Sequence, residues 1–153
     1  MNWFKLIISL IIPQLAAIIG GLFTAKSIPT WYATLIKPSF NPPNWLFGPV
    51  WTTLYLLMGI SLYLVWNSQK DFKVALIIFG IQLGLNLLWS ILFFGLHQPL
   101  WAFIEIIFLW IFIVLNIIFF YKISPVAGLI QIPYLLWVSF AALLNFFLWR
   151  LNL

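Results

Sequence analysis

The sequence predicts an all-α protein, an integral membrane bundle of five transmembrane helices. Of its residues, 65% are hydrophobic and only 6% are charged, which is too little polar surface to cover a water-soluble domain of this size. The apolar stretches are also roughly 20 residues long, the length of a helix that crosses ~30 Å of hydrocarbon. A membrane barrel would instead show short segments of alternating polarity.

Charged residues and prolines divide the chain into five apolar stretches. The expected spans are about 3–25, 45–67, 74–96, 100–121 and 126–149. Because most connections are short, we expect antiparallel neighbours in one domain covering residues 1–153. The first stretch is longer than a secretory signal core and contains Pro13, which favours a retained helix. We expect a multi-pass protein of a bacterial cell membrane, with an orientation that the nearly even distribution of basic residues leaves open.

The ionisable residues exclude several classes of function. The net charge of +5 is spread over the loops, so no patch for nucleic acid is expected. Two acids, one histidine and no cysteine are too few for a catalytic triad, a dicarboxylate site or a metal cage. We therefore expect no metal and no resident cofactor.

The third span has two distinct faces. At 100° per residue, one stripe contains polar and aromatic side chains and the opposite face contains a glycine pair, Gly80 and Gly84. Small residues four apart let another helix approach closely. We interpret the pair as a helix contact, either between protomers or within the chain.

Amides and aromatic rings recur on single faces of three spans. An amide without a partner is costly in hydrocarbon, so these faces should point into the bundle, where the amides bind protein groups or a ligand. The three stripes are Gln82, Asn86, Trp89 and Phe93; Tyr134, Trp137, Ala141 and Asn145; and Trp51, Tyr55 and Met58.

The remaining aromatic and ionisable residues are assigned by position. Six tryptophans near span ends are expected to be interfacial anchors, whereas Trp51, Trp89, Trp110 and Trp137 lie deeper and either pack in the core or line a cavity. For Glu105, the acid within a span, we favour a structural pairing over a ligand role. For His97 we favour a solvated loop position over a haem ligand.

The loop at 26–44 is rich in prolines and precedes an apolar helix that begins WLFGPVW. Pro38, Pro42 and Pro43 fix φ and prevent a continuous helix, so the backbone should have a defined, bent shape. We expect this loop to act as a lid beside the aromatic stripes.

The same residues resemble the TspO/MBR family of tryptophan-rich sensory and translocator proteins. The matching blocks are Trp31-Tyr32, Lys37-Pro38, Pro42-Pro43, Pro49-Val50-Trp51, Leu54-Tyr55, Met58-Gly59, Gln82-Leu83, Asn86, Trp89-Ser90, Phe93-Phe94, Glu105, Pro133 to Trp137, Phe140-Ala141 and Asn145. They occur in order over nearly the whole chain.

The resemblance implies a homodimer whose Gly80 and Gly84 match the small-residue dimer element. It also implies a pocket for porphyrins and flat lipophilic drugs beneath the lid loop, and in some relatives a light- and oxygen-dependent breakdown of porphyrin by tryptophans in the positions of Trp51 and Trp137. The implied ligand-binding residues are Tyr32, Trp51, Tyr55, Asn86, Trp89, Trp137 and Ala141.

Three functions are consistent with these expectations. The first is a membrane receptor or sensor that binds tetrapyrroles and similar flat lipophiles between its helices. The second is an enzyme that photo-oxidises bound porphyrin without a metal. The third, a porphyrin or lipophile transporter, has the least support because the spans show no inverted repeat and no chain of charged residues.

Overall fold

Residues 2–153, which the computed structural model describes, are almost entirely helical and contain no strand. The helices are α1 (Trp3–Ser27), the short α2 (Trp31–Thr34), α3 (Phe47–Trp66), α4 (Lys73–Ser90), α5 (Pro99–Ile123), α6 (Pro125–Leu129) and α7 (Ile132–Leu151). A 3-10 turn, Asn44–Leu46, precedes α3, and a π-helical turn, Ile91–Gly95, extends α4. The predicted all-α class is confirmed.

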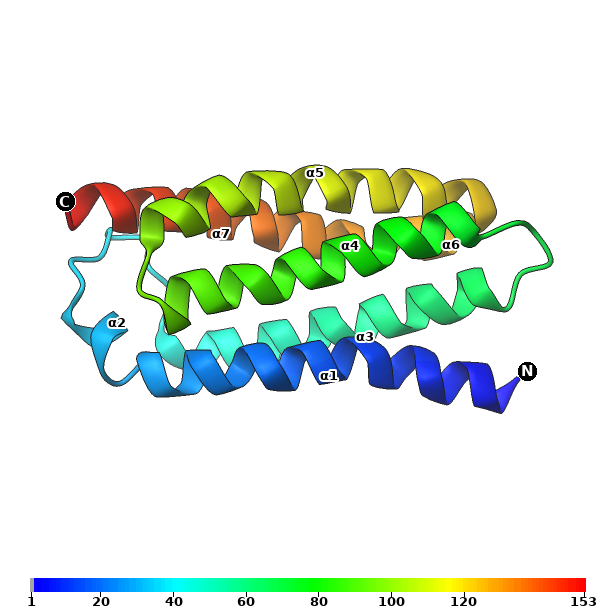
Figure 1. Ribbon diagram of the computed structural model, residues 1–153, viewed down its shortest axis with the longest axis horizontal. Helices are drawn as coiled ribbons and strands as arrows, with labels where there is room; N and C mark the ends of the chain where they lie inside the picture. The colour runs from blue at the N-terminus through cyan, green and yellow to red at the C-terminus, as the bar shows by residue number, and fades with distance from the viewer. Residues whose placement is uncertain (1) are drawn as a thin grey trace.

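Five helical segments are long and apolar enough to cross a membrane. They are Trp3–Ser27, Asn44–Trp66, Lys73–Gly95, Pro99–Ile123 and Pro125–Leu151. Their bounds differ from the expected spans by at most two residues. With an odd number of crossings, the termini lie at opposite ends of the bundle (Figure 1). The fifth span is interrupted between α6 and α7, just before Pro133.

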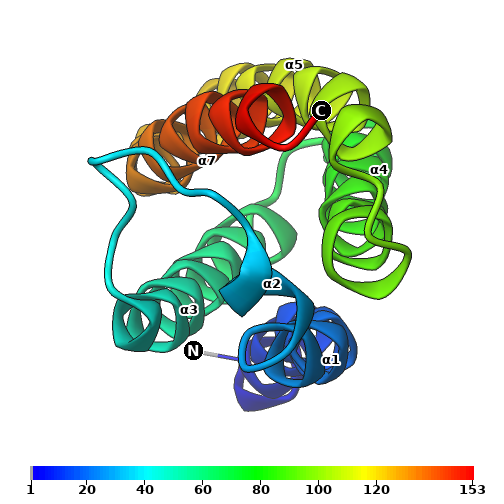
Figure 2. The ribbon, with the colours of Figure 1, turned by 90° about the vertical axis from the view of Figure 1, so that its left-hand side faces the viewer.

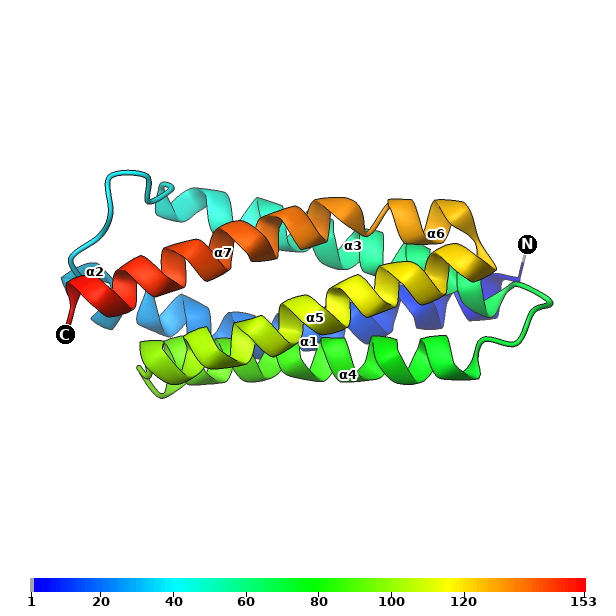
Figure 3. The same cartoon turned by 90° about the horizontal axis from the view of Figure 1, so that it is seen from above.

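Viewed from the end that carries α2, the helices follow one another around the bundle in the order α1, α3, α7, α5, α4 (Figure 2). The backbone of α1 packs against α3 and α4, and α5 packs against α4 and α7. In contrast, α3 packs against the fifth span mainly through α6, at the end away from the lid (Figure 3). At the lid end, side chains rather than close backbones therefore occupy the region between α3 and α7.

The outer faces of the helices are apolar, as lipid contact requires. Leu22, Ile77 and Leu136 are each more than 60% exposed. Lysines lie instead at the helix ends, where the last carbonyls of a helix attract cations. Lys5 donates to the Trp66 carbonyl, and Lys70 donates to the carbonyls of Lys122 and Ile123.

The glycine pair on α4 lies on an outer face. Gly80 and Gly84 are exposed, and a Cβ added at either would meet nothing within 4 Å in the described chain. Packing against another helix of the same chain, one of the two sequence-based alternatives, is therefore wrong at these positions. The contact between protomers stays a prediction.

Candidate functional site: an aromatic cavity beneath the lid loop

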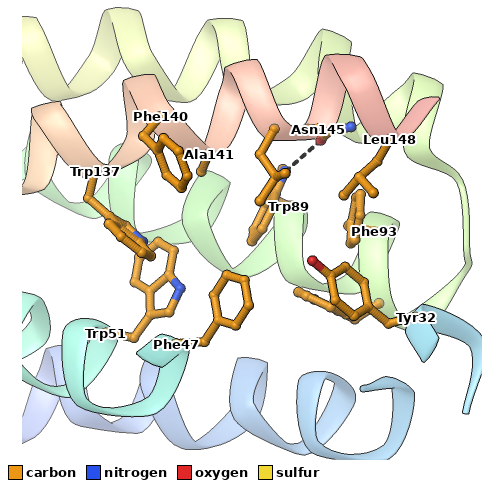
Figure 4. A pocket seen from close by; sticks show the side chains of 12 residues that line it. Tyr32, Phe47, Trp51, Trp89, Phe93, Trp137, Phe140, Ala141, Asn145 and Leu148 are labelled. Carbon is orange, nitrogen blue, oxygen red and sulfur yellow. Dashed lines mark hydrogen bonds between the residues drawn. The ribbon is translucent and has the colours of Figure 1, made fainter. Parts of the chain in front are cut away.

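A cavity lies at the lid end of the bundle, between α3, α4 and α7 (Figure 4). Aromatic rings make up most of its wall, and Tyr32 of α2 closes the lid end. The lining residues are Tyr32, Phe47, Trp51, Trp89, Phe93, Phe94, Trp137, Phe140, Ala141, Leu144, Asn145 and Leu148.

Helix geometry places these rings together. On α7, Trp137, Ala141, Leu144 and Leu148 recur at intervals of three and four residues, so they share one face. On the other side, the π-helical turn after α4 directs both Phe93 and Phe94 inward, where they are 2% and 6% exposed. Such turns often occur at functional sites.

The cavity is nearly filled by its own side chains. The volume open to the centre of a water-sized sphere is about 20 Å³, which is room for roughly one water molecule. Rings contact one another across it: Phe47 meets Trp137 edge-on, and the Trp89 ring stacks on Phe93 at 5.5 Å between centroids. The structure therefore represents a closed conformation of the site.

The polar groups of the wall differ in their bonding. Trp89 donates its indole N–H to Asn145 Oδ1 at 3.0 Å, and Asn145 donates to the Pro99 carbonyl at 2.8 Å. The indole N–H of Trp137 is buried and has no partner among the described residues. A donor without an acceptor in an apolar cavity is costly unless a ligand accepts from it.

The loop between α1 and α3 covers the cavity as a lid. Tyr32 is 1% exposed and donates to Asn41 Oδ1 at 2.6 Å, which joins the two halves of the loop. Burial raises the pKa of Tyr32 to about 12, and the hydrogen bond to Asn41 opposes this rise. The Phe40 ring meets Phe140 and Phe147 of α7 edge-on.

The residue that follows α7, Asn152, is hydrogen-bonded to the lid loop. Asn152 accepts from the Ile36 N–H at 2.8 Å and donates to the Ile36 carbonyl at 2.9 Å, so one side chain binds both polar groups of one lid residue. Pro38, Pro42 and Pro43 lie in this covering loop, but none of them lines the cavity.

A hydrogen-bonded network of amides and phenols supports the wall from inside the bundle. Tyr55 donates to Asn86 Oδ1, Asn86 donates to the Tyr134 hydroxyl at 2.8 Å, and Tyr134 donates to Gln82 Oε1 at 3.0 Å. All four side chains are at most 5% exposed. The network ties α3, α4 and α7 together at one level, so the protein itself supplies the partners of Asn86.

The structure brings most of the predicted ligand-binding residues to the cavity, but not all. Tyr32, Trp51, Trp89, Trp137 and Ala141 line it. Tyr55 lines a separate cleft on the other side of Trp51, and Asn86 lines neither space. Of the deep tryptophans, Trp110 faces outward and donates to Ser139 at 2.8 Å.

Sequence reasoning missed part of the cavity wall. Phe47 lies four residues before Trp51, and Leu144 and Leu148 continue the α7 stripe. Helical spacing was a sufficient signal for these three residues. The predicted stripes contain some apolar residues, such as Phe93 and Ala141, but not these three.

Of the two expectations for ionisable residues, the one for Glu105 is wrong and the one for His97 is confirmed. Glu105 is 7% exposed and both of its carboxyl oxygens lack a partner among the described residues, so the expected structural pairing is wrong. Glu105 lies within α5 and is buried in the bundle, whereas the basic residues lie at helix ends or in loops. His97 is exposed in a turn, as expected, but its ring is ordered by stacking on Trp31 at 4.4 Å.

The fold and the cavity define a class: a five-span integral membrane protein with an aromatic site under a lid loop. The TspO/MBR family model matches residues 9–150, and the chain belongs to this family. It is 49% identical to the tryptophan-rich protein TspO of Archaeoglobus fulgidus, over 99% of both chains. The human translocator protein is 38% identical over 92% of this chain and 85% of the relative. The tryptophan-rich sensory protein of Cereibacter sphaeroides is 36% identical over 80% and 77%.

Proposed function

We propose that this protein is a membrane receptor or sensor that binds a flat lipophilic molecule of the tetrapyrrole class in the aromatic cavity beneath the lid. The name of one relative, a tryptophan-rich sensory protein, supports a sensory role. The cavity supports the ligand class, because stacked indoles and phenyl rings favour planar apolar guests.

The unpaired indole N–H of Trp137 carries the proposal. It is a buried hydrogen-bond donor with no partner among the described residues, whereas the indole N–H of Trp89 and the side chain of Asn145 in the same wall are already bonded. A ligand with an acceptor at its edge, such as a carboxylate or a carbonyl, would satisfy this donor while its face stacks on Trp51 or Trp89.

Binding requires the closed cavity to open. A tetrapyrrole is far larger than the room for one water that the closed site offers, so the rings must rotate or the lid must move. The lid is the movable part, since a few hydrogen bonds and ring contacts hold it. We therefore propose that ligand binding is coupled to a displacement of the loop from Tyr32 to Asn41.

Equilibrium titration of the purified protein with protoporphyrin IX tests the proposal. Trp137→Phe keeps an aromatic ring but removes the N–H, and we expect its affinity to fall roughly five- to tenfold. Trp110→Phe is the matched control, because Trp110 lies outside the cavity, and its affinity should equal that of the wild type. Equal affinity in all three proteins would contradict the proposed site.

A second candidate function is photo-oxidation of bound porphyrin by light and oxygen. The supporting observation is that Trp51 and Trp137, the two rings expected to be redox-active, line the same cavity. Illuminated reactions should then give a distinct product that Trp51→Phe suppresses. The enzymatic hypothesis fails if protein-free micelles give the same product at the same rate.

Two further proposals concern transport and assembly. Several relatives are named translocator proteins, and uptake of porphyrin into proteoliposomes would distinguish a transporter from a receptor. The exposed faces of Gly80 and Gly84 support a homodimer through α4. Replacing both glycines with leucine should then prevent dimer formation, so that chemical cross-linking yields monomer only. An unchanged yield of cross-linked dimer would place the interface elsewhere.

A further inference from the structure

A second and larger space opens beside the cavity, between α1 and α3 at the lid end. The volume open to the centre of a water-sized sphere is about 290 Å³ in this space. The floor is formed by α4 and the π-helical turn. The lining residues are Ala17, Gly20, Gly21, Thr24, Ala25, Ile28, Asn44, Phe47, Gly48, Trp51, Thr52, Tyr55, Trp89, Ser90 and Phe94. We call this space the α1–α3 cleft.

The cleft exists because α1 and α3 are in backbone contact near Ser9 and Gly59 and separate toward the lid end. At Gly59 an added Cβ would lie 2.9 Å from the Ser9 carbonyl oxygen and 3.0 Å from Leu10 Cα, so the two backbones are in contact there. In this antiparallel pair, the same register places Gly48 opposite Gly20 and Gly21. A Cβ added at Gly48 or Gly21 would meet nothing within 4 Å.

The mouth of the cleft faces the outside of the bundle. Gly21 and Ala25 on α1, and Gly48 and Thr52 on α3, line the cleft and are exposed. They lie in the lid-end parts of two spans that are long and apolar enough to cross the membrane, so the mouth faces the surrounding lipid near the head-group region of the lid side. The floor at Gly20 is closed by Ser90, whose Oγ would lie 3.1 Å from an added Cβ.

The lining presents a mainly apolar surface, because three of its four hydroxyl groups are bonded within the protein and only that of Ser90 has no hydrogen bond among the described residues. Thr24 donates to the Gly20 carbonyl and Thr52 donates to the Gly48 carbonyl. Hydroxyls bonded to their own helix backbone need no further partner. Tyr55 is likewise bonded to Asn86. The interior of the cleft therefore favours a guest without polar groups.

The length and the polarity of the cleft match one lipid chain. From Ala17 to Ala25 the cleft follows α1 for about 12 Å at 1.5 Å per residue, compared with roughly 15 Å for one leaflet of a ~30 Å hydrocarbon core. Polar groups occur at the lid end, where Asn44 lines the cleft and Lys26 follows Ala25 in the last turn of α1. A cationic residue therefore follows the last cleft-lining position of α1, close to where a phosphate head group would lie.

We propose that the α1–α3 cleft is a binding site for one acyl chain of a bilayer phospholipid, with the chain inserted toward Trp51 and the head group beside Asn44 and Lys26. The surrounding lipid is the solvent at this depth, and its chains compete with any other guest for an apolar space. This site is distinct from the proposed ligand site, although Phe47, Trp51, Trp89 and Phe94 form a wall common to both.

Native mass spectrometry of the protein released from phosphatidylglycerol vesicles into a mild detergent tests the proposal. The wild type should retain one phospholipid per protomer. Gly21→Leu and Ala25→Leu each place a larger side chain in the cleft, and the retained fraction should fall at least tenfold. Leu22→Trp is the matched control on the same helix, because Leu22 is 61% exposed and lies outside the cleft; it should retain the lipid.

Three outcomes would overturn the proposal. Retention of the same lipid by Gly21→Leu and Ala25→Leu, with wild-type circular dichroism and melting, would exclude the cleft as its site. Loss of the lipid from the wild type would show that no specific site exists. If protoporphyrin IX loses affinity in Gly21→Leu but not in Ala141→Leu, the cleft is the porphyrin site instead. Loss of porphyrin binding in Ala141→Leu alone leaves the lipid site intact, so the two proposals fail separately.

Discussion

The aromatic cavity and the α1–α3 cleft differ in size although they have one wall in common. The shared rings are Phe47, Trp51, Trp89 and Phe94. Opposite that wall, α7 contributes Trp137 and Phe140 and leaves about 20 Å³, whereas α1 contributes glycine, alanine and threonine and leaves about 290 Å³. The side chains facing the common wall therefore decide whether a space is filled or open. A filled space must rearrange to bind, and an open one can accept lipid at once.

The largest expected effect concerns the helix contact that creates the cleft. Gly59→Ala introduces a Cβ 2.9 Å from the backbone of α1, and overpacking of this kind costs about 1–3 kcal/mol. Gly21→Ala adds the same group where nothing lies within 4 Å, and its better helix propensity should leave stability unchanged or slightly raised. Thermal unfolding in detergent measures both. Equal losses would show that the helices do not separate toward the lid.

The network behind the shared wall gives the next largest effect. Asn86→Leu removes the acceptor of Tyr55 and the donor to Tyr134, and we expect a loss of about 1–2 kcal/mol. Asn116→Leu is the matched control, because Asn116 is equally buried but makes no side-chain hydrogen bond in the described chain. It should cost less or stabilise the protein. A greater loss at Asn116 than at Asn86 in thermal unfolding would contradict the role of the network.

A smaller effect is expected for the lid contact at Asn152, which should alter access to the covered cavity but not to the uncovered cleft. Asn152→Ala removes two exposed hydrogen bonds to Ile36, at a cost of about 1 kcal/mol or less. The lid should open more often, so porphyrin should associate several-fold faster while the phospholipid in the cleft is retained. Stopped-flow fluorescence measures the association rate. An unchanged rate would mean that this contact does not hold the lid closed.

The smallest effect is a pH dependence of the lid. Burial raises the pKa of Tyr32 from 10.0 to about 12, with an opposing contribution from Asn41, and the Lys37 Nζ lies 5.0 Å from the same ring. Because the folded protein keeps this proton longer than the unfolded chain, the stabilisation is complete below pH 10 and is lost as the pH rises toward 12. Tyr32→Phe should lack this decline. The difference between the two melting temperatures from pH 9 to 12 tests this.

The spans were predictable from the sequence because length and hydropathy determine them almost alone. The stripe through Asn86 and Trp89 was predictable for a similar reason, since a buried amide must face other protein groups. The partners of each amide were not predictable. Asn86 meets two phenols from different helices, while Glu105 has no hydrogen-bond partner within residues 2–153. Helical periodicity gives the direction of a side chain but not the neighbour that lies there.

The volumes of the aromatic cavity and the α1–α3 cleft could not be predicted from the sequence either. Gly59 and Gly48 lie on the same helix and look alike in the sequence, yet one is in contact with α1 and the other faces open space. The difference arises from the crossing of two helices, which no single span encodes. The ring of His97 is a similar case, since its stacking on Trp31 depends on where the lid folds back.

The central claim is that a planar ligand binds in the aromatic cavity between α3 and α7. Porphyrin affinity in a pair of adjacent variants tests it most directly. Ala141 lines the cavity and Ala142 does not, so Ala141→Leu and Ala142→Leu add the same group inside and outside the site. The account predicts at least tenfold weaker binding of protoporphyrin IX for Ala141→Leu and wild-type binding for Ala142→Leu. Wild-type affinity in Ala141→Leu would contradict it.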